Sequence, residues 1–184
     1  MPLKLLKRLF LMTILASILS ACSTTNLPSI ATVPQVNLPK FMGSWYVIAA
    51  IPTAIETESF NAVETYSLDK DGSIATTFTY NKGSLDGKLK TYQPRGFVMP
   101  NSGNALWGMQ FIWPIKAEYR IVYLNEDYSQ TVIARNARDY VWIMARTPTI
   151  SDAEYNNLTQ FVKEIGYDIS QLRKVPHNHI DNKP

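Results

Sequence analysis

The chain contains only one cysteine, Cys22, and only two histidines, His177 and His179, among its 184 residues. A single cysteine excludes an intrachain disulfide, and it also excludes zinc and iron–sulfur sites that are built from several cysteines. The two histidines lie in a polar C-terminal tail, residues 176–184, which we interpret as solvated rather than as a weak metal site. The sequence therefore predicts neither a metal site nor a cofactor.

Acidic residues are absent before Glu56, whereas Lys4, Lys7 and Arg8 lie within the first ten residues. Removing these three from the 18 basic residues leaves 15, which equals the 15 acidic residues, so they account for the whole net charge of +3. A folded part without net charge and without a run of Lys and Arg lacks the electrostatic footprint of a nucleic-acid-binding protein. We therefore expect no nucleic-acid partner.

The apolar run Leu9–Leu19 is shorter than the about 20 residues that a membrane-spanning helix needs. Because it follows a basic start, it is typical of a secretory signal peptide, which we expect to cover residues 1–21. The run ends in Leu-Ser-Ala-Cys at 19–22, which resembles the bacterial lipobox, whose cysteine thiol receives a diacylglyceryl group. A buried Cys22 beside an ordinary signal peptide is the alternative interpretation.

Two or three acyl chains on Cys22 would hold the mature protein at a membrane without crossing it. Ser23 follows the cysteine, where an Asp usually means retention at the inner membrane of Gram-negative bacteria. The lipoprotein pattern therefore predicts the periplasmic face of the outer membrane. The Ser/Thr/Pro-rich residues 22–36 are interpreted as a lipidated N-terminus and linker.

Residues 37–175 are expected to form one folded domain of the all-β class. Clusters of Gly, Pro, Asn and Asp separate short segments rich in β-branched and aromatic residues. These segments predict eight antiparallel strands at about 44–52, 61–69, 73–81, 88–98, 104–113, 117–125, 129–135 and 139–147. Eight up-and-down strands close most naturally into a barrel that has room for one small ligand, and a seven-stranded sandwich is the competing architecture.

The spacing of apolar residues changes after the last of these strands. Leu158, Phe161, Val162 and Ile165 recur at i, i+3, i+4 and i+7, which predicts a helix with one apolar face. Residues 151–154 form a candidate capping box, and Gly166 would end the helix. One C-terminal helix can cover only one side of the barrel from outside, and a last short strand at about 171–175 is expected to pair back onto the sheet.

Alternation within the strands places large apolar side chains on shared faces. These sets are Trp107, Met109 and Phe111; Tyr119, Ile121 and Tyr123; Ile74, Phe78 and Tyr80; and Tyr140, Trp142 and Met144. Aromatic groups with hydroxyl or indole donors favour an apolar pocket with a few polar anchors, and a packed aromatic core is the alternative. Glu64 also lies on a predicted inward face. A carboxylate there costs free energy unless it lies near the mouth of the barrel or has a partner.

Gly43-Ser44-Trp45-Tyr46 at the start of the first strand resembles the first signature of the lipocalins. Arg138-Asp139-Tyr140, the strand end at Trp142–Arg146 and the turn 147–152 follow in the expected order. With the lipobox, the pattern is similar to that of the bacterial outer-membrane lipocalins, relatives of apolipoprotein D. The resemblance implies an eight-stranded calyx that binds fatty acids or lysophospholipids.

The resemblance also implies a structural signature of Gly43, Trp45, Tyr46 and Arg146, with the Arg146 guanidinium over the Trp45 indole at the closed end. The inferred inward faces supply the ligand contacts that we expect, namely Trp107, Met109, Phe111, Tyr119, Ile121 and Trp142. Pro94-Arg95-Gly96 departs from the Gly-x-Ala of relatives, and a proline cannot donate to a strand ladder, so the local sheet is in doubt there.

Catalysis is not expected, and no catalytic residue is assigned. The prostaglandin isomerase chemistry known in similar proteins needs a cysteine inside the calyx, whereas Cys22 is assigned to the lipid, and serine hydrolysis would need a base such as histidine. The expected function is storage or transport of a fatty acid or lysophospholipid beside the outer membrane. A scaffold lipoprotein with a filled barrel is the alternative, and the oligomeric state is left open, a homodimer included.

Overall fold

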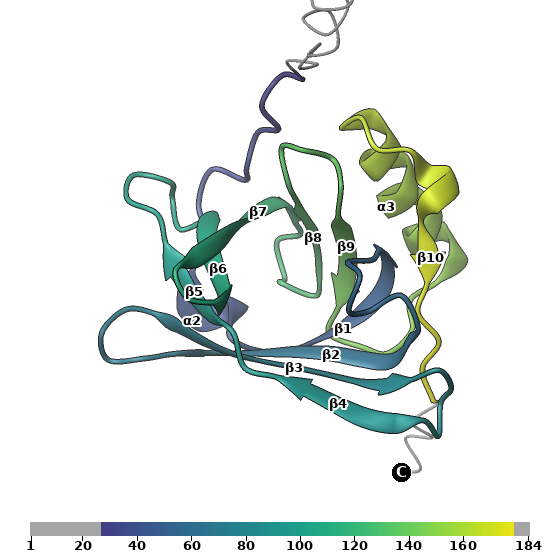
Figure 1. Ribbon diagram of the computed structural model, residues 1–184. Coiled ribbons are helices and arrows are strands. Elements are labelled where there is room, and N and C mark those ends of the chain that lie inside the picture. Colours follow the sequence, from purple (N-terminus) through teal and green to yellow (C-terminus); the bar gives the residue numbers. More distant parts are fainter. Residues whose placement is uncertain (1–26, 179–184) are drawn as a thin grey trace, which may run out of the picture.

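The computed structural model describes residues 27–178, and it consists mostly of antiparallel strands (Figure 1). The strands are β1 Gly43–Ile51, β2 Ser59–Leu68, β3 Ile74–Lys82, β4 Lys88–Tyr92, β5 Arg95–Val98, β6 Leu106–Ile112, β7 Ile115–Leu124, β8 Gln130–Ala134, β9 Val141–Ala145 and β10 Arg173–Lys174. The helices are α2 Leu38–Phe41, α3 Asp152–Glu164 and the 3₁₀ turn η1 Ile169–Gln171.

The sheet closes into a barrel because β9 pairs with β1, with Met144 opposite Val47 and Trp142 opposite Ala50. The strands between them pair in chain order, and β4 and β5 together take the place of one strand, which makes eight barrel strands. Closure confirms the predicted up-and-down barrel and excludes the sandwich. The last short strand is also confirmed, because β10 pairs with Ala49 and Ala50 of β1, beyond the part of β1 that pairs with β2.

The fourth predicted strand, 88–98, is interrupted. β4 pairs with the second half of β3, and β5 pairs with the start of β3 through Ala75 opposite Arg95, so the strand breaks at Gln93 and Pro94. Pro94 has no N–H for the ladder, but its carbonyl accepts a 3.1 Å hydrogen bond from the Thr76 amide. The proline therefore breaks the strand without opening the wall.

Helix α3 covers one side of the barrel, as predicted (Figure 1). Its capping box is present, because the Ser151 hydroxyl accepts from the Glu154 amide and the Glu154 carboxylate accepts from the Ser151 amide. Leu158 and Val162 are buried against outward-facing apolar side chains of the barrel. Within residues 27–178, none of the helices has the length and apolar character that crossing a membrane would require.

One predicted inward position is wrong. Tyr123 was expected to share the inward face of Tyr119 and Ile121, but the β7–β8 register shifts between Ile121 and Tyr123. The extra residue turns Tyr123 to the outside, where its ring lies 5.5 Å from that of Phe161 on α3. Strict alternation fails here because a bulge interrupts it.

The linker interpretation of 22–36 needs correction over the residues that the structure describes. Val33 donates to the Ile121 carbonyl at 2.9 Å and Val36 to the Gly103 carbonyl at 2.8 Å, and Ile30 and Val36 are buried. Figure 1 shows this purple segment passing beside β7 and β6 before it reaches α2. Its few apolar side chains find partners on the barrel wall, so the segment is docked. Residues 1–26, with the predicted signal peptide and Cys22, lie outside the described residues.

The solvated-tail interpretation is also wrong for His177. Its Nε2 lies 2.8 Å from the Val47 carbonyl, and its ring packs edge-on against Tyr46 at 5.6 Å. Burial lowers the pKa of His177 below its usual value. His179 lies outside the described residues, and within residues 27–178 no three His, Cys, Asp or Glu side chains gather as a metal-binding group.

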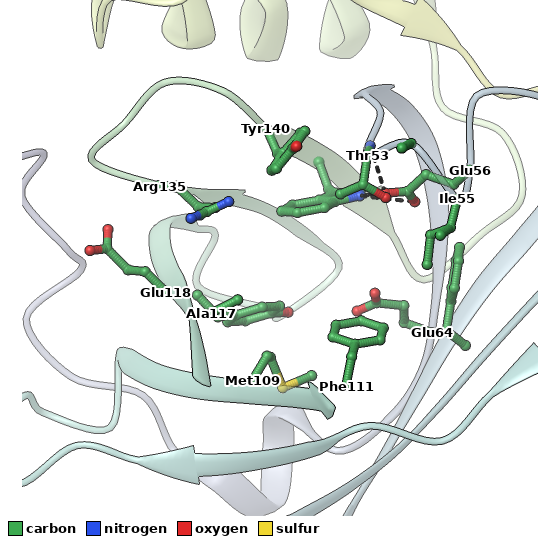
Figure 2. Close-up of a pocket in the computed structure, with 14 residues that line it drawn as sticks. Thr53, Ile55, Glu56, Glu64, Met109, Phe111, Ala117, Glu118, Arg135 and Tyr140 are labelled. Atoms are coloured by element: carbon green, nitrogen blue, oxygen red, sulfur yellow. Dashed lines mark hydrogen bonds between the residues drawn. The ribbon is translucent and has the colours of Figure 1, made fainter. Parts of the chain in front are cut away.

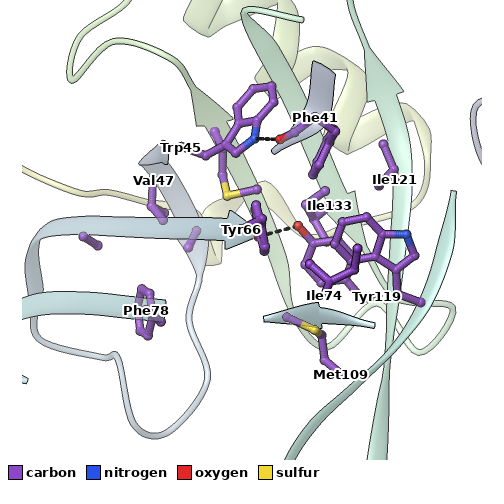
Figure 3. Close-up of a cluster of buried hydrophobic side chains, with 14 of the residues drawn as sticks. Phe41, Trp45, Val47, Tyr66, Ile74, Phe78, Met109, Tyr119, Ile121 and Ile133 are labelled. Carbon is purple, nitrogen blue, oxygen red and sulfur yellow. Dashed lines mark hydrogen bonds between the residues drawn. The ribbon is translucent and has the colours of Figure 1, made fainter. Parts of the chain in front are cut away.

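The closed end is sealed by α2 and by Arg146. The Arg146 guanidinium lies 3.8 Å from the centre of the Trp45 ring, as the resemblance implies. Its Nη2 donates to the Lys40, Phe41 and Met42 carbonyls and its Nη1 to the Ser44 carbonyl, at 2.8 to 3.0 Å. The indole of Trp45 donates to the Phe41 carbonyl at 2.9 Å (Figure 3). Gly43 adopts φ +91°, and a Cβ there would lie 3.4 Å from Arg146 Nη1.

Trp45→Ala should lower the free energy of unfolding by about 3–5 kcal/mol, because it truncates a fully buried aromatic side chain and removes the surface on which Arg146 lies. Urea unfolding followed by circular dichroism measures the effect. Trp113→Ala is the control, since this exposed side chain should change the free energy by no more than about 0.5 kcal/mol. Equal losses in the two variants would contradict the structural role of Trp45.

Candidate functional site

A cavity of about 310 Å³ occupies the end of the barrel opposite α2 (Figure 2). In an up-and-down barrel, alternate connections lie at the same end, so the β1–β2, β3–β4, β6–β7 and β8–β9 connections surround this mouth. The cavity is lined by Thr53, Ala54, Ile55, Glu56, Glu64, Phe78, Met109, Phe111, Ala117, Glu118, Tyr119, Arg135, Tyr140 and Trp142. Its volume is within the range of about 300–1,000 Å³ that is usual for small-molecule sites.

Four of the six expected ligand contacts line this cavity, namely Met109, Phe111, Tyr119 and Trp142. They come from β6, β7 and β9, whose inward positions converge on the same space. Tyr140 and Phe78, from the predicted inward sets, also line it. Their contact with a ligand stays a prediction.

Trp107 and Ile121 are placed elsewhere. Both are fully buried in the aromatic and aliphatic layer below the cavity. Figure 3 shows Ile121 in this cluster. Trp107 stacks on Tyr119 with ring centres 5.0 Å apart, and its indole donates to the Asn104 carbonyl at 2.7 Å. This layer forms the floor of the cavity. Trp107 and Ile121 therefore point inward, as predicted, but lie too deep to line the cavity.

The β1–β2 connection supplies wall residues that the sequence pattern did not indicate. Glu56 is buried and folds back into the mouth, where its Oε1 accepts from the Thr53 amide at 3.0 Å and from the Thr53 hydroxyl at 2.7 Å. Its Oε2 accepts from the Trp142 indole at 3.2 Å. Glu56 therefore holds both the connection and the Trp142 ring in place. A connection without strand periodicity carries no signal that could have predicted this.

Glu64 lies inside the barrel on the cavity wall (Figure 2). Burial, and then the nearby Glu56 charge, raise the pKa of Glu64 to about 8. The Tyr66 hydroxyl donates to the Glu64 carboxyl and is also 2.6 Å from the Tyr119 hydroxyl. Burial, helped by Glu64, raises the pKa of Tyr119 well above its usual value. At neutral pH these groups are therefore predominantly uncharged, and the cavity interior is compatible with an apolar ligand.

Arg135 is the basic residue of the cavity wall. Its Nη1 donates to the Asp139 carboxylate at 2.9 Å, and its guanidinium lies 5.2 Å from the centre of the Tyr140 ring. Its Nε is buried and has no hydrogen-bond partner among residues 27–178. A buried donor without a partner is costly, and a ligand acceptor would remove that cost. The sequence pattern placed this residue at a strand end, where alternation does not predict a site.

The model of the Lipocalin-like domain matches residues 36–177, which covers the whole barrel, helix α3 and the closed-end signature. The chain belongs to the lipocalin family. Family membership places it among proteins that bind and carry small hydrophobic molecules.

This lipocalin is 31% identical over 163 residues to temperature-induced lipocalin-1 of Arabidopsis thaliana, a match that covers 79% of this chain and 82% of the relative. It is 28% identical over 168 residues to the outer membrane lipoprotein Blc of Escherichia coli K12, covering 85% and 89% of the two chains. The solved structure of insecticyanin from the tobacco hornworm Manduca sexta has the same fold, with a TM-score of 0.66, 12% identity and coverage of 83% and 86%.

The lipocalin should lose stability as the pH rises from about 4.5 to about 8, because the folded chain keeps the Glu64 proton up to about pH 8 whereas the unfolded chain releases it near pH 4.5. The slope due to this group is at most about 1.4 kcal/mol per pH unit. Glu64→Gln should remove that part of the pH dependence. Urea unfolding at a series of pH values measures it.

Glu126→Gln is the matched control, because Glu126 is an exposed carboxyl in the β7–β8 turn. Its profile should follow that of the wild type. A Glu64→Gln profile parallel to the wild type between pH 5 and pH 8 would show that Glu64 is ionised in the folded chain at neutral pH.

Proposed function

We propose that this lipocalin binds one single-chain amphiphile, a fatty acid or a lysophospholipid, and stores or transports it at the outer membrane. The acyl chain lies in the cavity, and the head group lies at the mouth. The observation that carries the proposal is an apolar cavity whose wall includes a buried Arg135 N–H without a partner among residues 27–178.

The apolar part of the wall favours an acyl chain. Side chains such as Ile55, Phe78, Met109 and Phe111 offer surface that excludes water, and burial of each methylene contributes about 0.8 kcal/mol. The nearby Glu64 carboxyl does not oppose this at neutral pH, because its raised pKa of about 8 keeps it mostly protonated.

Arg135 favours an anionic head group. A carboxylate or phosphate oxygen can accept from the free Nε and form a charge-assisted hydrogen bond, which is stronger than a neutral one. Arg135 begins the β8–β9 connection, so the head group would lie at the mouth while the tail extends toward the Trp107 floor.

The cellular location is part of the proposal. We infer a diacylglyceryl anchor on Cys22, on the periplasmic face of the outer membrane, from the lipobox-like residues 19–22. Relatives from Escherichia coli and Vibrio cholerae bear the name outer membrane lipoprotein Blc, which supports this location.

A binding protein is favoured over an enzyme and over a scaffold. The residues that line the cavity include no Cys, His or Ser, and the Thr53 hydroxyl is bonded to Glu56, so the described wall offers no nucleophile paired with a histidine base. The scaffold alternative requires a filled barrel, whereas the space above the Trp107 layer is open.

Trp142→Ala should weaken acyl-ligand binding roughly tenfold, since it removes a large apolar wall residue worth at least about 1.4 kcal/mol. The delipidated chain from residue 23 to 184 is titrated with oleate and with oleoyl lysophosphatidylcholine, and tryptophan fluorescence reports saturation at one site per chain or per homodimer. Phe97→Ala is the control, because Phe97 follows the inward Gly96 on β5 and lies beneath Lys116 on the outer face.

Failure of the folded wild type to bind either ligand would overturn the acyl-lipid proposal and support the scaffold alternative. Equal weakening by Trp142→Ala and Phe97→Ala would instead mean that the cavity is not the site of binding.

Arg135→Gln should weaken the binding of palmitate roughly tenfold or more, because a hydrogen bond to a charged group contributes about 1.5–3 kcal/mol. The binding of hexadecanol, which has the same chain length and no charge, should change by less than about twofold. Competition against a fluorescent fatty acid measures both affinities. Parallel losses for the two ligands would contradict a head-group role for Arg135.

A further inference from the structure

The β6–β7 hairpin ends in an apolar tip, residues 112–115, with the sequence Ile-Trp-Pro-Ile. Trp113 is 82% exposed, Ile112 72% and Ile115 68%, the highest exposures among the large apolar side chains of residues 27–178. Contiguous exposed apolar side chains of this size are uncommon on soluble proteins and mark interaction sites. The tip is therefore the strongest candidate for an interaction site among residues 27–178.

The apolar tip lies at the mouth of the barrel. Phe111, the residue before it, lines the cavity, and Ala117 lines it from β7 on the other side of the turn (Figure 2). Two further exposed apolar side chains lie at the same end, Ile55 in the β1–β2 connection and Leu89 just after the β3–β4 turn.

The described N-terminus begins at this same end. The Pro28 carbonyl accepts from Arg138 Nη2 at 2.7 Å, and the Ile30 amide donates to the Asn136 side chain at 2.9 Å. Asn136 and Arg138 belong to the β8–β9 connection at the mouth. Cys22 precedes Pro28 by six residues, which can span at most about 22 Å.

We propose that the apolar tip inserts into the interfacial layer of a phospholipid bilayer, so that the mouth of the barrel faces the membrane. The orientation rests on the proposed lipid anchor at Cys22. The short segment between Cys22 and Pro28 leaves the barrel beside its mouth, so the anchor would hold the mouth near the bilayer. Trp113 suits this position, since an indole ring favours the level of the lipid head groups. A lipid anchor and a protein contact together bind a membrane more firmly than either does alone.

A second copy of the chain fits the tip less well. Its three large side chains have at most about 250 Å² of surface each, which is below the about 800 Å² per partner of a stable interface even if all of it were covered. A bilayer needs no complementary surface. A mouth that faces the membrane would let an amphiphile pass between the bilayer and the cavity without crossing water.

The first experiment uses the chain from residue 23 to 184, which includes every described residue. Its binding to vesicles of phosphatidylethanolamine and phosphatidylglycerol is measured by cosedimentation. The double variant Ile112→Asn, Trp113→Gln should bind the vesicles at least tenfold more weakly than the wild type. The control is Leu68→Asn, Met99→Gln, which changes two side chains at the closed end that are 42% and 43% exposed and should leave vesicle binding unchanged.

Circular dichroism verifies that both variants are folded, and palmitate titration should give wild-type affinity in both because none of these four residues lines the cavity. Vesicle binding by the tip variant equal to that of the wild type, or no binding by the wild type, would overturn the proposal. It would also be overturned if the wild type were a dimer that the tip variant dissociates. A different outcome would overturn only the proposed function: the wild type fails to bind palmitate but still binds vesicles through the apolar tip.

The second experiment tests orientation in the lipid-anchored full-length protein. Vesicles that contain phospholipid with brominated acyl chains should quench a component of the tryptophan fluorescence, and Trp113→Phe should remove that component. The other three tryptophans are buried or line the cavity, so Trp113 is the suitable reporter. Equal quenching in the wild type and in Trp113→Phe, or none in the wild type, would overturn the membrane-facing orientation.

Discussion

Arg146 stabilises the closed end of the barrel. The barrel has one open end because this closure holds. The Arg146 guanidinium lies on the Trp45 ring while it donates to the carbonyls around α2, so a half-buried charge has both an indole face and several carbonyl dipoles as partners. The planar fork of an arginine can satisfy this arrangement, whereas the single ammonium of a lysine cannot. With this end sealed, the cavity lies at the opposite end of the barrel.

The interior of the barrel is divided by depth. Phe41, Tyr66, Trp107 and Tyr119 contact one another and fill the lower half at ring separations of 5.0 to 6.2 Å. Above them, the wall of the cavity is mostly apolar, and burial keeps its Glu64 carboxyl mostly protonated. The same inward face therefore supplies packed core near the floor and the wall of the cavity near the mouth, and the position of a side chain along the barrel axis decides which of the two it joins.

The up-and-down topology brings four separate features to the mouth. The Glu56 connection, Arg135, the apolar tip and the start of the described chain are distant in sequence, yet alternate connections of an antiparallel barrel all lie at one end. The proposed lipid head-group site and the proposed membrane contact are consequently neighbours. Exchange of a lipid between a bilayer and the cavity would then need only a short path.

Alternation, turn residues and the capping box were sufficient to predict the barrel strands, the helix and the inward direction of Trp107, Met109 and Trp142, because these are local properties of the chain. These local patterns could not predict how deep an inward side chain lies in the barrel. Strands on the far side of the barrel decide which inward side chains border free space. Local patterns also missed the bulge that turns Tyr123 outward. Arg135 joins the site only through closure of the barrel, because a residue at a strand end has no periodicity and acquires its neighbours from elements that are remote in sequence.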